Sequence, residues 1–248
     1  MRNEYGIQLY SIRDLAEESL ASALEAVSEL GYKYVEFAGF FGNSAEQVLR
    51  MLKENKLEVS GTHTSWKELA PENLPALIEF HKAIRNKNVI IPAFDAKEDT
   101  LEKIISYVNC AAPILANHGI SIGYHNHSFE FIRTPYGKII FDEIASKTNV
   151  DLEIDVFWAY NAGLDPIALA EKYKGRIKAF HLKDGFSESE SDSGKPEGKA
   201  LGEGNTPIKA VIEYAEKNGI LLIVESEGLD PSGREEVARC MAYLRDNG

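Results

Sequence analysis

The chain has 248 residues, of which 27 are Lys or Arg and 39 are Asp or Glu, so its formal net charge is −12. Hydrophobic residues make up 44% of the sequence, an ordinary share for a globular domain, which excludes a disordered or fibrous chain. The acidic balance argues against a general nucleic-acid binder, because such proteins depend on neutralising phosphates. The longest uninterrupted apolar run, Ile220 to Val224, is too short to cross a membrane.

The N-terminus and the cysteines indicate where the protein resides. Met1 to Tyr10 lack the apolar segment and small-residue cleavage site of a secretory signal. Cys110 and Cys240 stand far apart, without the spacing of metal ligands. We therefore expect a cytoplasmic protein that keeps its thiols reduced.

Two kinds of segment alternate along the chain. Short runs rich in β-branched and aromatic residues predict eight strands, at 5–10, 32–38, 57–63, 88–93, 120–125, 150–155, 177–182 and 220–225. Amphipathic stretches between them predict eight helices, at 15–30, 44–55, 71–85, 99–117, 141–148, 165–173, 207–218 and 232–245. Glycines at 31, 119, 175 and 219 stand where a helix would end and a strand begin.

Eight strand–helix units in about 250 residues favour one closed (β/α)8 barrel, a TIM barrel that spans residues 1–248 as a single domain. A Rossmann sheet is less consistent with the sequence, because no helix opens on a G-x-G-x-x-G or P-loop motif. The stretch at about 185–204, rich in Ser, Gly, Glu and Asp, is the longest without periodicity. It would be the seventh βα-loop, on the face where barrel active sites lie, and it is either a mobile lid or an ordinary solvated insertion.

Polar side chains occur where the predicted strands end, although buried barrel strands are usually almost wholly apolar. The set comprises Glu36, His63, His125, Asn126, His127, Glu153, Asp155, His181, Lys183, Glu225 and Glu227. Residues two apart on a strand share a face, so inward-facing pairs would bring carboxylates and imidazoles to one mouth of the barrel. Such a cluster requires pairing or a metal ion. Its carboxylate and imidazole donors suit Mn²⁺, Mg²⁺, Co²⁺ or Zn²⁺.

Each of these residues also has a structural interpretation. A single His at a strand end is often only hydrogen-bonded, and Glu153 could form a buried ion pair with a lysine on a neighbouring strand. Glu36 could fix a loop backbone, and Glu227 could belong to a solvated loop. The joint occurrence of Asp155, His181 and Glu225 on three successive strand ends is what favours a metal site.

At these positions the sequence resembles the xylose isomerase-like TIM-barrel superfamily, in the branch of sugar phosphate isomerases and epimerases. The resemblance covers nearly the whole chain and rests on these segments in order: Gly6–Asp14, Gly31–Glu36, Val59–His63, Gly123–His127, Glu153–Trp158, His181–Asp184, Gly202–Gly204 and Val224–Glu225. The family's usual metal ligands are Glu, Asp, His and Glu on strands five to eight. Asp155, His181 and Glu225 match three of them, but His125 of a Tyr-His-Asn-His motif replaces the first Glu.

The resemblance implies a divalent-metal-dependent isomerase or epimerase that acts on a keto- or aldo-sugar, or a sugar phosphate, through a metal-stabilised enediolate. Mn²⁺ is the first expectation for the metal, with His125, Asp155, His181 and Glu225 as ligands. Glu225 and His127 would form the acid–base pair. Contacts to the sugar would come from His63, Glu36, Trp158 and Lys183, and Arg13 either binds a phosphate or carboxylate or is an ordinary surface arginine.

Two other functions stay open, a dehydratase of the inosose dehydratase type and a non-catalytic sugar-binding barrel. A DNA-repair endonuclease of the same superfamily would need more metal ligands and a basic face, which six histidines and a charge of −12 do not favour. We expect a small-molecule sugar or sugar phosphate as the partner, with no nucleic acid and no membrane. The sequence leaves open whether the chain forms a homo-oligomer.

Overall fold

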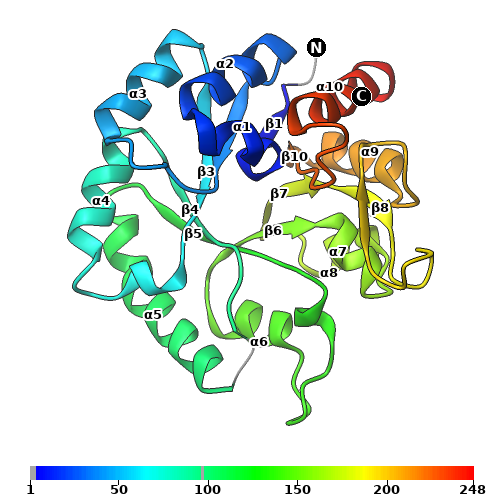
Figure 1. Cartoon of the computed structure of the whole chain (residues 1–248). Coiled ribbons are helices and arrows are strands. Elements are labelled where there is room, and N and C mark those ends of the chain that lie inside the picture. Colours follow the sequence, from blue (N-terminus) through cyan, green and yellow to red (C-terminus); the bar gives the residue numbers. More distant parts are fainter. Residues whose placement is uncertain (1–3, 96–97) are drawn as a thin grey trace.

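Eight parallel strands close into a barrel, and helices surround it, in the computed structural model of this chain (Figure 1), which describes residues 4–95 and 98–248. The order around the barrel is β1-β10-β7-β6-β5-β4-β3-β2, with β1 also paired to β2. The barrel strands are β1 (Gly6–Gln8), β2 (Tyr34–Phe37), β3 (Glu58–His63), β4 (Asn88–Ile91), β5 (Ser121–His125), β6 (Asp151–Asp155), β7 (Ile177–Leu182) and β10 (Leu221–Val224). The predicted (β/α)8 barrel is therefore confirmed.

The helices are more numerous than predicted. They are α1 (Arg13–Glu18), α2 (Leu20–Leu30), α3 (Ala45–Glu54), α4 (Leu74–Ala83), α5 (Glu98–Ala116), α6 (Ile140–Lys147), α7 (Val156–Asn161), α8 (Pro166–Lys172), α9 (Ile208–Asn218) and α10 (Gly233–Asn247). The helix expected at 15–30 is divided at Ser19, whose extended backbone interrupts it and whose hydroxyl accepts a hydrogen bond from Ser22 N at the start of α2. Gly31 and Gly219 end α2 and α9 in the left-handed conformation, as predicted.

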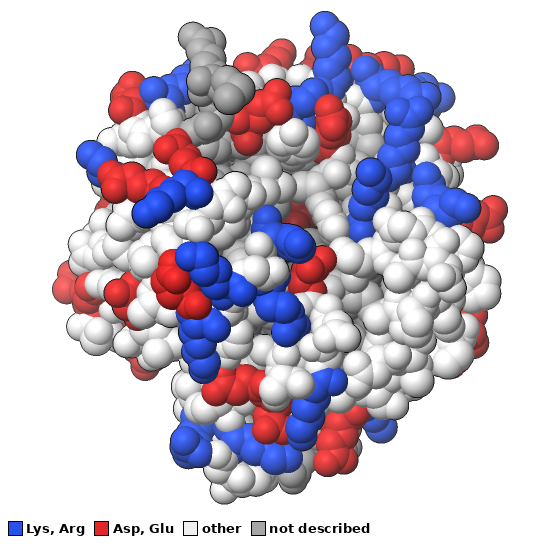
Figure 2. All heavy atoms as spheres, turned by 180° about the vertical axis from the view of Figure 1, so that it is seen from behind, with Lys and Arg blue, Asp and Glu red and all other residues white. Residues whose placement is uncertain are grey.

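The hydrophobic core lies mainly between the barrel and its helices. Val35 and Phe37 on β2 and Phe180 on β7 are fully buried there. No helix among residues 4–95 and 98–248 is long and apolar enough to span a bilayer. In Figure 2, basic and acidic side chains are interspersed over the face shown, and no single basic region dominates it.

Two strands carry one residue more than the neighbour with which they pair. On β3, the pairs Val35–Val59 and Glu36–Gly61 leave Ser60 as the additional residue. On β7, the pairs Leu152–Ile177 and Glu153–Ala179 leave Lys178 in the same position. Such irregularities re-aim nearby side chains and are common beside active sites. Here they adjoin Glu36 and Glu153.

The segment predicted to be a loop at about 185–204 contains a two-stranded antiparallel hairpin, β8 (Asp184–Phe186) with β9 (Glu197–Lys199). The buried carboxylate of Asp184 joins the two ends of this segment. Its Oδ1 accepts the N–H groups of Gly185 at 2.8 Å and Thr206 at 3.0 Å, and its Oδ2 accepts those of Gly202 at 2.8 Å and Gly204 at 3.1 Å. The segment therefore returns to the end of β7, where it began.

Candidate metal centre and sugar pocket

A pocket of about 470 Å³ opens at the carboxyl ends of the barrel strands. We call it the mouth pocket, and it is lined by Tyr10, Ala38, His63, Pro92, Ala93, His125, His127, Trp158, Glu225 and Glu227. This volume lies within the range of about 300–1,000 Å³ found for small-molecule sites. The position agrees with the rule that barrel active sites occupy the C-terminal face.

The four residues predicted as metal ligands lie together beside this pocket. One donor atom from each of His125, Asp155, His181 and Glu225 lies within 4.8 Å of the others, and all four residues are buried. They come from the ends of β5, β6, β7 and β10, which are neighbours in the barrel. The barrel topology therefore brings these four side chains together.

Local hydrogen bonds fix Asp155 at this position. The Asn126 side chain accepts the N–H of Asp155 at 3.1 Å and donates to its carbonyl oxygen at 3.2 Å, which ties the ends of β5 and β6. Asp155 Oδ1 accepts the N–H of Trp158 at 2.9 Å and caps α7. Oδ2 of Asp155 is buried without a hydrogen-bond partner among the described residues. Burial raises the pKa of Asp155 to about 8, although the charge of Lys183 opposes this.

A divalent cation fits this donor set. Mn²⁺, Co²⁺ and Zn²⁺ are commonly coordinated by carboxylates together with imidazoles, whereas Mg²⁺ prefers the carboxylate oxygens. Oδ2 of Asp155 has no hydrogen-bond partner among the described residues, so it is available to coordinate a cation. Burial lowers the pKa of His125 to about 3, so its imidazole is neutral, as metal ligation requires. The arrangement therefore agrees with the chemistry of a metal centre.

Glu225 is held as a carboxylate by two neighbouring groups, Lys183 and His181. Burial alone would raise the pKa of Glu225, but the charge of Lys183 and the hydrogen bond to His181 hold it well below its usual range. Glu225 Oε2 lies 3.0 Å from His181 Nδ1 and 4.0 Å from Lys183 Nζ. The same ammonium pairs with Glu227 Oε1 at 2.7 Å and lies 4.7 Å from the centre of the Trp158 ring.

His127 is held in place by a residue that the sequence analysis did not select. Its backbone N–H donates to Glu130 Oε2 at 2.9 Å, while Tyr124 Oη donates to Glu130 Oε1 at 2.8 Å. Burial lowers the pKa of His127 to about 4, so its ring is neutral near pH 7. The signal for Glu130 was present in the sequence as an acidic residue three positions after His127.

The predicted sugar-contacting residues are not all at the mouth pocket. His63 and Trp158 line it, whereas Lys183 is not part of its lining and has only 1% of its surface exposed. Arg13 is half-buried at the rim, where it donates to the carbonyl oxygens of Tyr10 and Glu227 and lies 4.5 Å from the Tyr10 ring centre. Glu36 does not line this pocket and is fully buried, so its position favours holding the histidines over touching a sugar.

Glu36 and Glu153 lie below the mouth pocket, in contact with its histidines. Glu153 Oε1 is 3.0 Å from His63 Nε2, 3.3 Å from His125 Nδ1 and 3.1 Å from His181 Nε2. Among the described residues, Glu153 therefore pairs with three histidines and not with a lysine on a neighbouring strand. Burial alone would lower the pKa of His63, but Glu36 and Glu153 outweigh it and raise the pKa to about 9.

The comparisons with known proteins agree with this fold. A family model described as the xylose isomerase-like TIM barrel matches residues 24–246. No curated protein sequence matches the chain. A sugar phosphate isomerase/epimerase from Parabacteroides distasonis has a TM-score of 0.79 and 24% identity, over 99% of this chain and 94% of that one.

Two further solved structures have the same fold at lower identity. A probable 3-DHS dehydratase of petrobactin synthesis from Bacillus anthracis has a TM-score of 0.76 and 14% identity, over 99% of this chain and 100% of that one. A D-allulose 3-epimerase from Methylomonas sp., in complex with D-allulose, has a TM-score of 0.72 and 14% identity, over 100% of this chain and 98% of that one. Because the family model spans nearly the whole barrel, the chain belongs to the xylose isomerase-like TIM barrel family.

Proposed function

We propose that this protein is a divalent-metal-dependent isomerase or epimerase of a keto- or aldo-sugar, or of a sugar phosphate. The observation that supports it most is the meeting of His125, Asp155, His181 and Glu225 within 4.8 Å at the mouth pocket. These four residues would hold the ion, with Mn²⁺ as the first candidate and Mg²⁺, Co²⁺ or Zn²⁺ as alternatives. Bound there, the ion supplies Lewis acidity toward a carbonyl and its adjacent hydroxyl.

Glu225 is the candidate base in this proposal. As a carboxylate at the pocket wall, it can take a proton from the carbon next to a carbonyl. His127, neutral and also at the wall, is the second proton carrier. Return of the proton to the neighbouring carbon isomerises the sugar, and return to the other face of the same carbon epimerises it. In both outcomes Glu225 would remove the proton and His127 would deliver a proton at a different position on the substrate.

The wall of the mouth pocket suits a polyhydroxylated ligand. Trp158 supplies an aromatic face for the C–H groups of a sugar, while His63 and Glu227 offer polar atoms for its hydroxyls. Lys183 lies between Glu225 and Glu227, close enough to influence both carboxylates. The names of two structural neighbours, the sugar phosphate isomerase/epimerase and the D-allulose 3-epimerase, are consistent with this substrate class.

A dehydratase is the second candidate, since removal of the same proton followed by loss of a β-hydroxyl eliminates water. The similarity of the fold to a probable 3-DHS dehydratase, over 99% of this chain and all of that one, favours keeping it. The proton that Glu225 removes would then pass through His127 to the departing hydroxyl and not return to carbon.

The first test is elemental analysis of the purified protein beside Asp155→Ala and His181→Ala variants. We expect a divalent metal in the unmodified chain, with the amount reduced in both variants and unchanged in Asp192→Ala, a control at an exposed loop residue. Protein that binds no metal after incubation with Mn²⁺ would contradict the proposal and leave a sugar-binding barrel.

Solvent exchange then separates the activities. Keto-sugars incubated with the metal-loaded protein in D₂O should gain deuterium at carbon if the chain isomerises or epimerises them. Loss of water, detected by mass spectrometry, would identify the dehydratase.

A further inference from the structure

A second cavity, of about 50 Å³, lies inside the barrel on the amino-terminal side of the mouth pocket, and we call it the interior cavity. Glu36 and Glu153, which lie within β2 and β6, line one end of it. The other end is lined by the half-buried Asp151, the first residue of β6, and by the exposed Lys178 of β7. The interior cavity therefore extends from the face where the strands begin to the two carboxylates that contact the histidines.

Small side chains make room for the interior cavity. Barrels of this kind normally fill their centre with layers of bulky branched residues. Here three of the strands contribute Ser60, Gly123 and Ala179 to the lining instead. Ser60 and Lys178, the additional residues on β3 and β7, both line the cavity, from opposite sides of the barrel. The two strand irregularities and the cavity therefore belong to one local arrangement.

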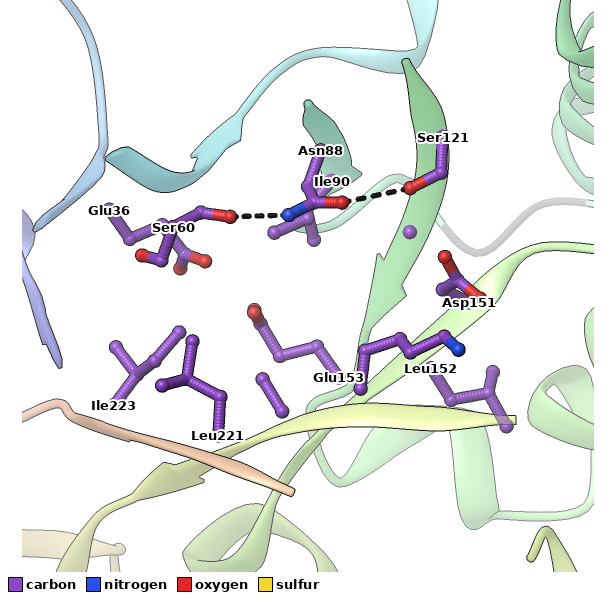
Figure 3. A pocket seen from close by; sticks show the side chains of 13 residues that line it. Glu36, Ser60, Asn88, Ile90, Ser121, Asp151, Leu152, Glu153, Leu221 and Ile223 are labelled. Atoms are coloured by element: carbon purple, nitrogen blue, oxygen red, sulfur yellow. Dashed lines mark hydrogen bonds between the residues drawn. The ribbon is translucent and has the colours of Figure 1, made fainter. Parts of the chain in front are cut away.

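Two buried oxygen atoms of the lining residues, Glu36 Oε2 and Ser60 Oγ, have no hydrogen-bond partner among residues 4–95 and 98–248. Glu36 is fully buried and Ser60 is 7% exposed. In Figure 3 the two side chains lie next to each other at one end of the cavity. A buried polar group without a partner costs about 1–3 kcal/mol, and more when it is charged. Both oxygens therefore require a hydrogen-bond partner from within the cavity.

The other oxygen of Glu36 is already occupied. Oε1 accepts the side-chain amide of Gln8 at 2.7 Å, and it lies 2.8 Å from His181 Nε2 and 3.0 Å from His63 Nε2. Since these three groups gather around one oxygen, none of them serves the other. The unmet requirement for a donor therefore belongs to Oε2.

A polar strip continues from Ser60 along the wall of the cavity (Figure 3). Asn88 Nδ2 donates to the carbonyl oxygen of Ser60 at 2.6 Å, and Ser121 Oγ donates to Asn88 Oδ1 at 2.9 Å. Asn88 and Ser121 are the first residues of β4 and β5, and both are half-buried. The strip therefore leads from the amino-terminal face of the barrel to the oxygen atoms that lack a partner.

Water is the ligand that fits these dimensions and these groups. A buried water needs about 10–15 Å³ and two to four polar partners, so the interior cavity has room for about three. Water can donate to the carboxylate and can exchange a hydrogen bond with the hydroxyl of Ser60. A sugar or another organic ligand is too large for this volume.

We propose that the interior cavity is a water-binding site, in which ordered water enters at the amino-terminal face of the barrel and hydrogen-bonds to Glu36 Oε2 and Ser60 Oγ. This water completes the hydrogen bonding of Glu36, whose other oxygen contacts His181. Ser60 and the water thereby become positioning groups for His181, and only this last step rests on the proposed function. The barrel then has two separate entries for solvent, the mouth pocket and the interior cavity.

The test is a crystal structure of the unmodified protein at a resolution that shows ordered water. We expect water within about 3.2 Å of Glu36 Oε2 and of Ser60 Oγ. An interior cavity without density, or a peak at the roughly 2.0–2.6 Å of a metal–oxygen bond, would overturn the proposal. This measurement does not depend on whether any variant folds.

Two variants of one residue then test the role of Ser60. Ser60→Val removes the hydroxyl and fills part of the cavity, so we expect the water beside Glu36 to be lost. Ser60→Ala is the matched control, because it removes the same hydroxyl but leaves the space, and the water should stay at Glu36 Oε2. A water that keeps its position in Ser60→Val would refute the role of Ser60 in this site.

Mn²⁺ affinity tests the step that rests on the proposed function. We expect Ser60→Val to bind Mn²⁺ about tenfold more weakly, because Glu36 then holds His181 less firmly, while Ser60→Ala stays within about twofold of the unmodified protein. Equal affinity in all three proteins would refute the positioning role. Water in the cavity of a protein that binds no Mn²⁺ would support the water site and contradict the proposed function.

Discussion

Replacement of Asp184 by Ala should loosen the segment that crosses from β7 to α9. Asp184 accepts four backbone N–H groups, and the variant leaves all of them without an acceptor. Gly202 is exposed and Gly204 half-buried, so water can replace the carboxylate for these two. Gly185 and Thr206 are buried and cannot be solvated in the same way.

The cost follows from the two buried groups. A hydrogen bond to a charged acceptor is worth about 1.5–3 kcal/mol, so losing those from Gly185 and Thr206 costs about 3–6 kcal/mol. In a chain of this size each kcal/mol lowers the melting temperature by about 2–4 °C. We expect a fall of at least about 6 °C, together with earlier tryptic cleavage after the half-buried Lys199 of β9.

Thermal denaturation and timed proteolysis measure the two effects separately. Asp165→Ala is the control, because Asp165 also accepts two backbone N–H groups but does so at the exposed start of α8. Its loss should cost about 1 kcal/mol, the usual value for a helix cap. A melting temperature of Asp184→Ala no lower than that of the control, with cleavage after Lys199 unchanged, would refute the reasoning.

Three other perturbations have defined outcomes. Burial lowers the pKa of His81 to about 4, so between pH 6.5 and 4 the unfolded chain binds a proton that the folded chain does not. The free energy of unfolding of the unmodified protein, relative to that of His81→Gln, should therefore fall by about 3 kcal/mol over this range. A difference in urea denaturation that stays constant with pH would contradict this. In Gly61→Ala the new Cβ would lie 2.6 Å from Ile90 Cδ1 and 2.9 Å from Glu36 Oε2, so we expect a loss of about 1–3 kcal/mol in the same assay, and an unchanged midpoint would count against it. Trp158→Leu should weaken sugar binding about tenfold, or 1.4 kcal/mol, with the metal content unchanged; equal affinity by calorimetry would remove Trp158 from the sugar site.

The alternation of strands and helices was readable because each strand is a short apolar run and each helix has an amphipathic face. The eight barrel strands are confirmed, but several of their predicted boundaries differ from the observed ones. The strand expected at 5–10 stops at Gln8, because the Gln8 side chain accepts the N–H of Tyr10 and turns the chain into a 3₁₀ helix, Leu9–Ile12. Side-chain bonds of this kind leave no trace in hydropathy.

The partners of the buried carboxylates could not be predicted from the sequence. Sequence patterns suggest contacts along one strand or with the next one, whereas Glu153 on β6 meets His63 on β3, across the interior of the barrel. Glu36 and His63 both lie on strands that end at the mouth of the barrel, and both are predicted sugar contacts. Closure of the barrel brings Glu36 against His63 and His181, and only His63 of these three lines the mouth pocket.

The additional residues on β3 and β7 have a consequence for anyone who would transplant this site. The two strands lie on opposite sides of the barrel, and a shift of one residue turns every following side chain to the other face. A scaffold with regular strands could carry Glu36, His63, Glu153 and His181 at the right places in its sequence and still point a histidine outward. The additional residues Ser60 and Lys178 therefore matter to this arrangement as much as the four side chains themselves.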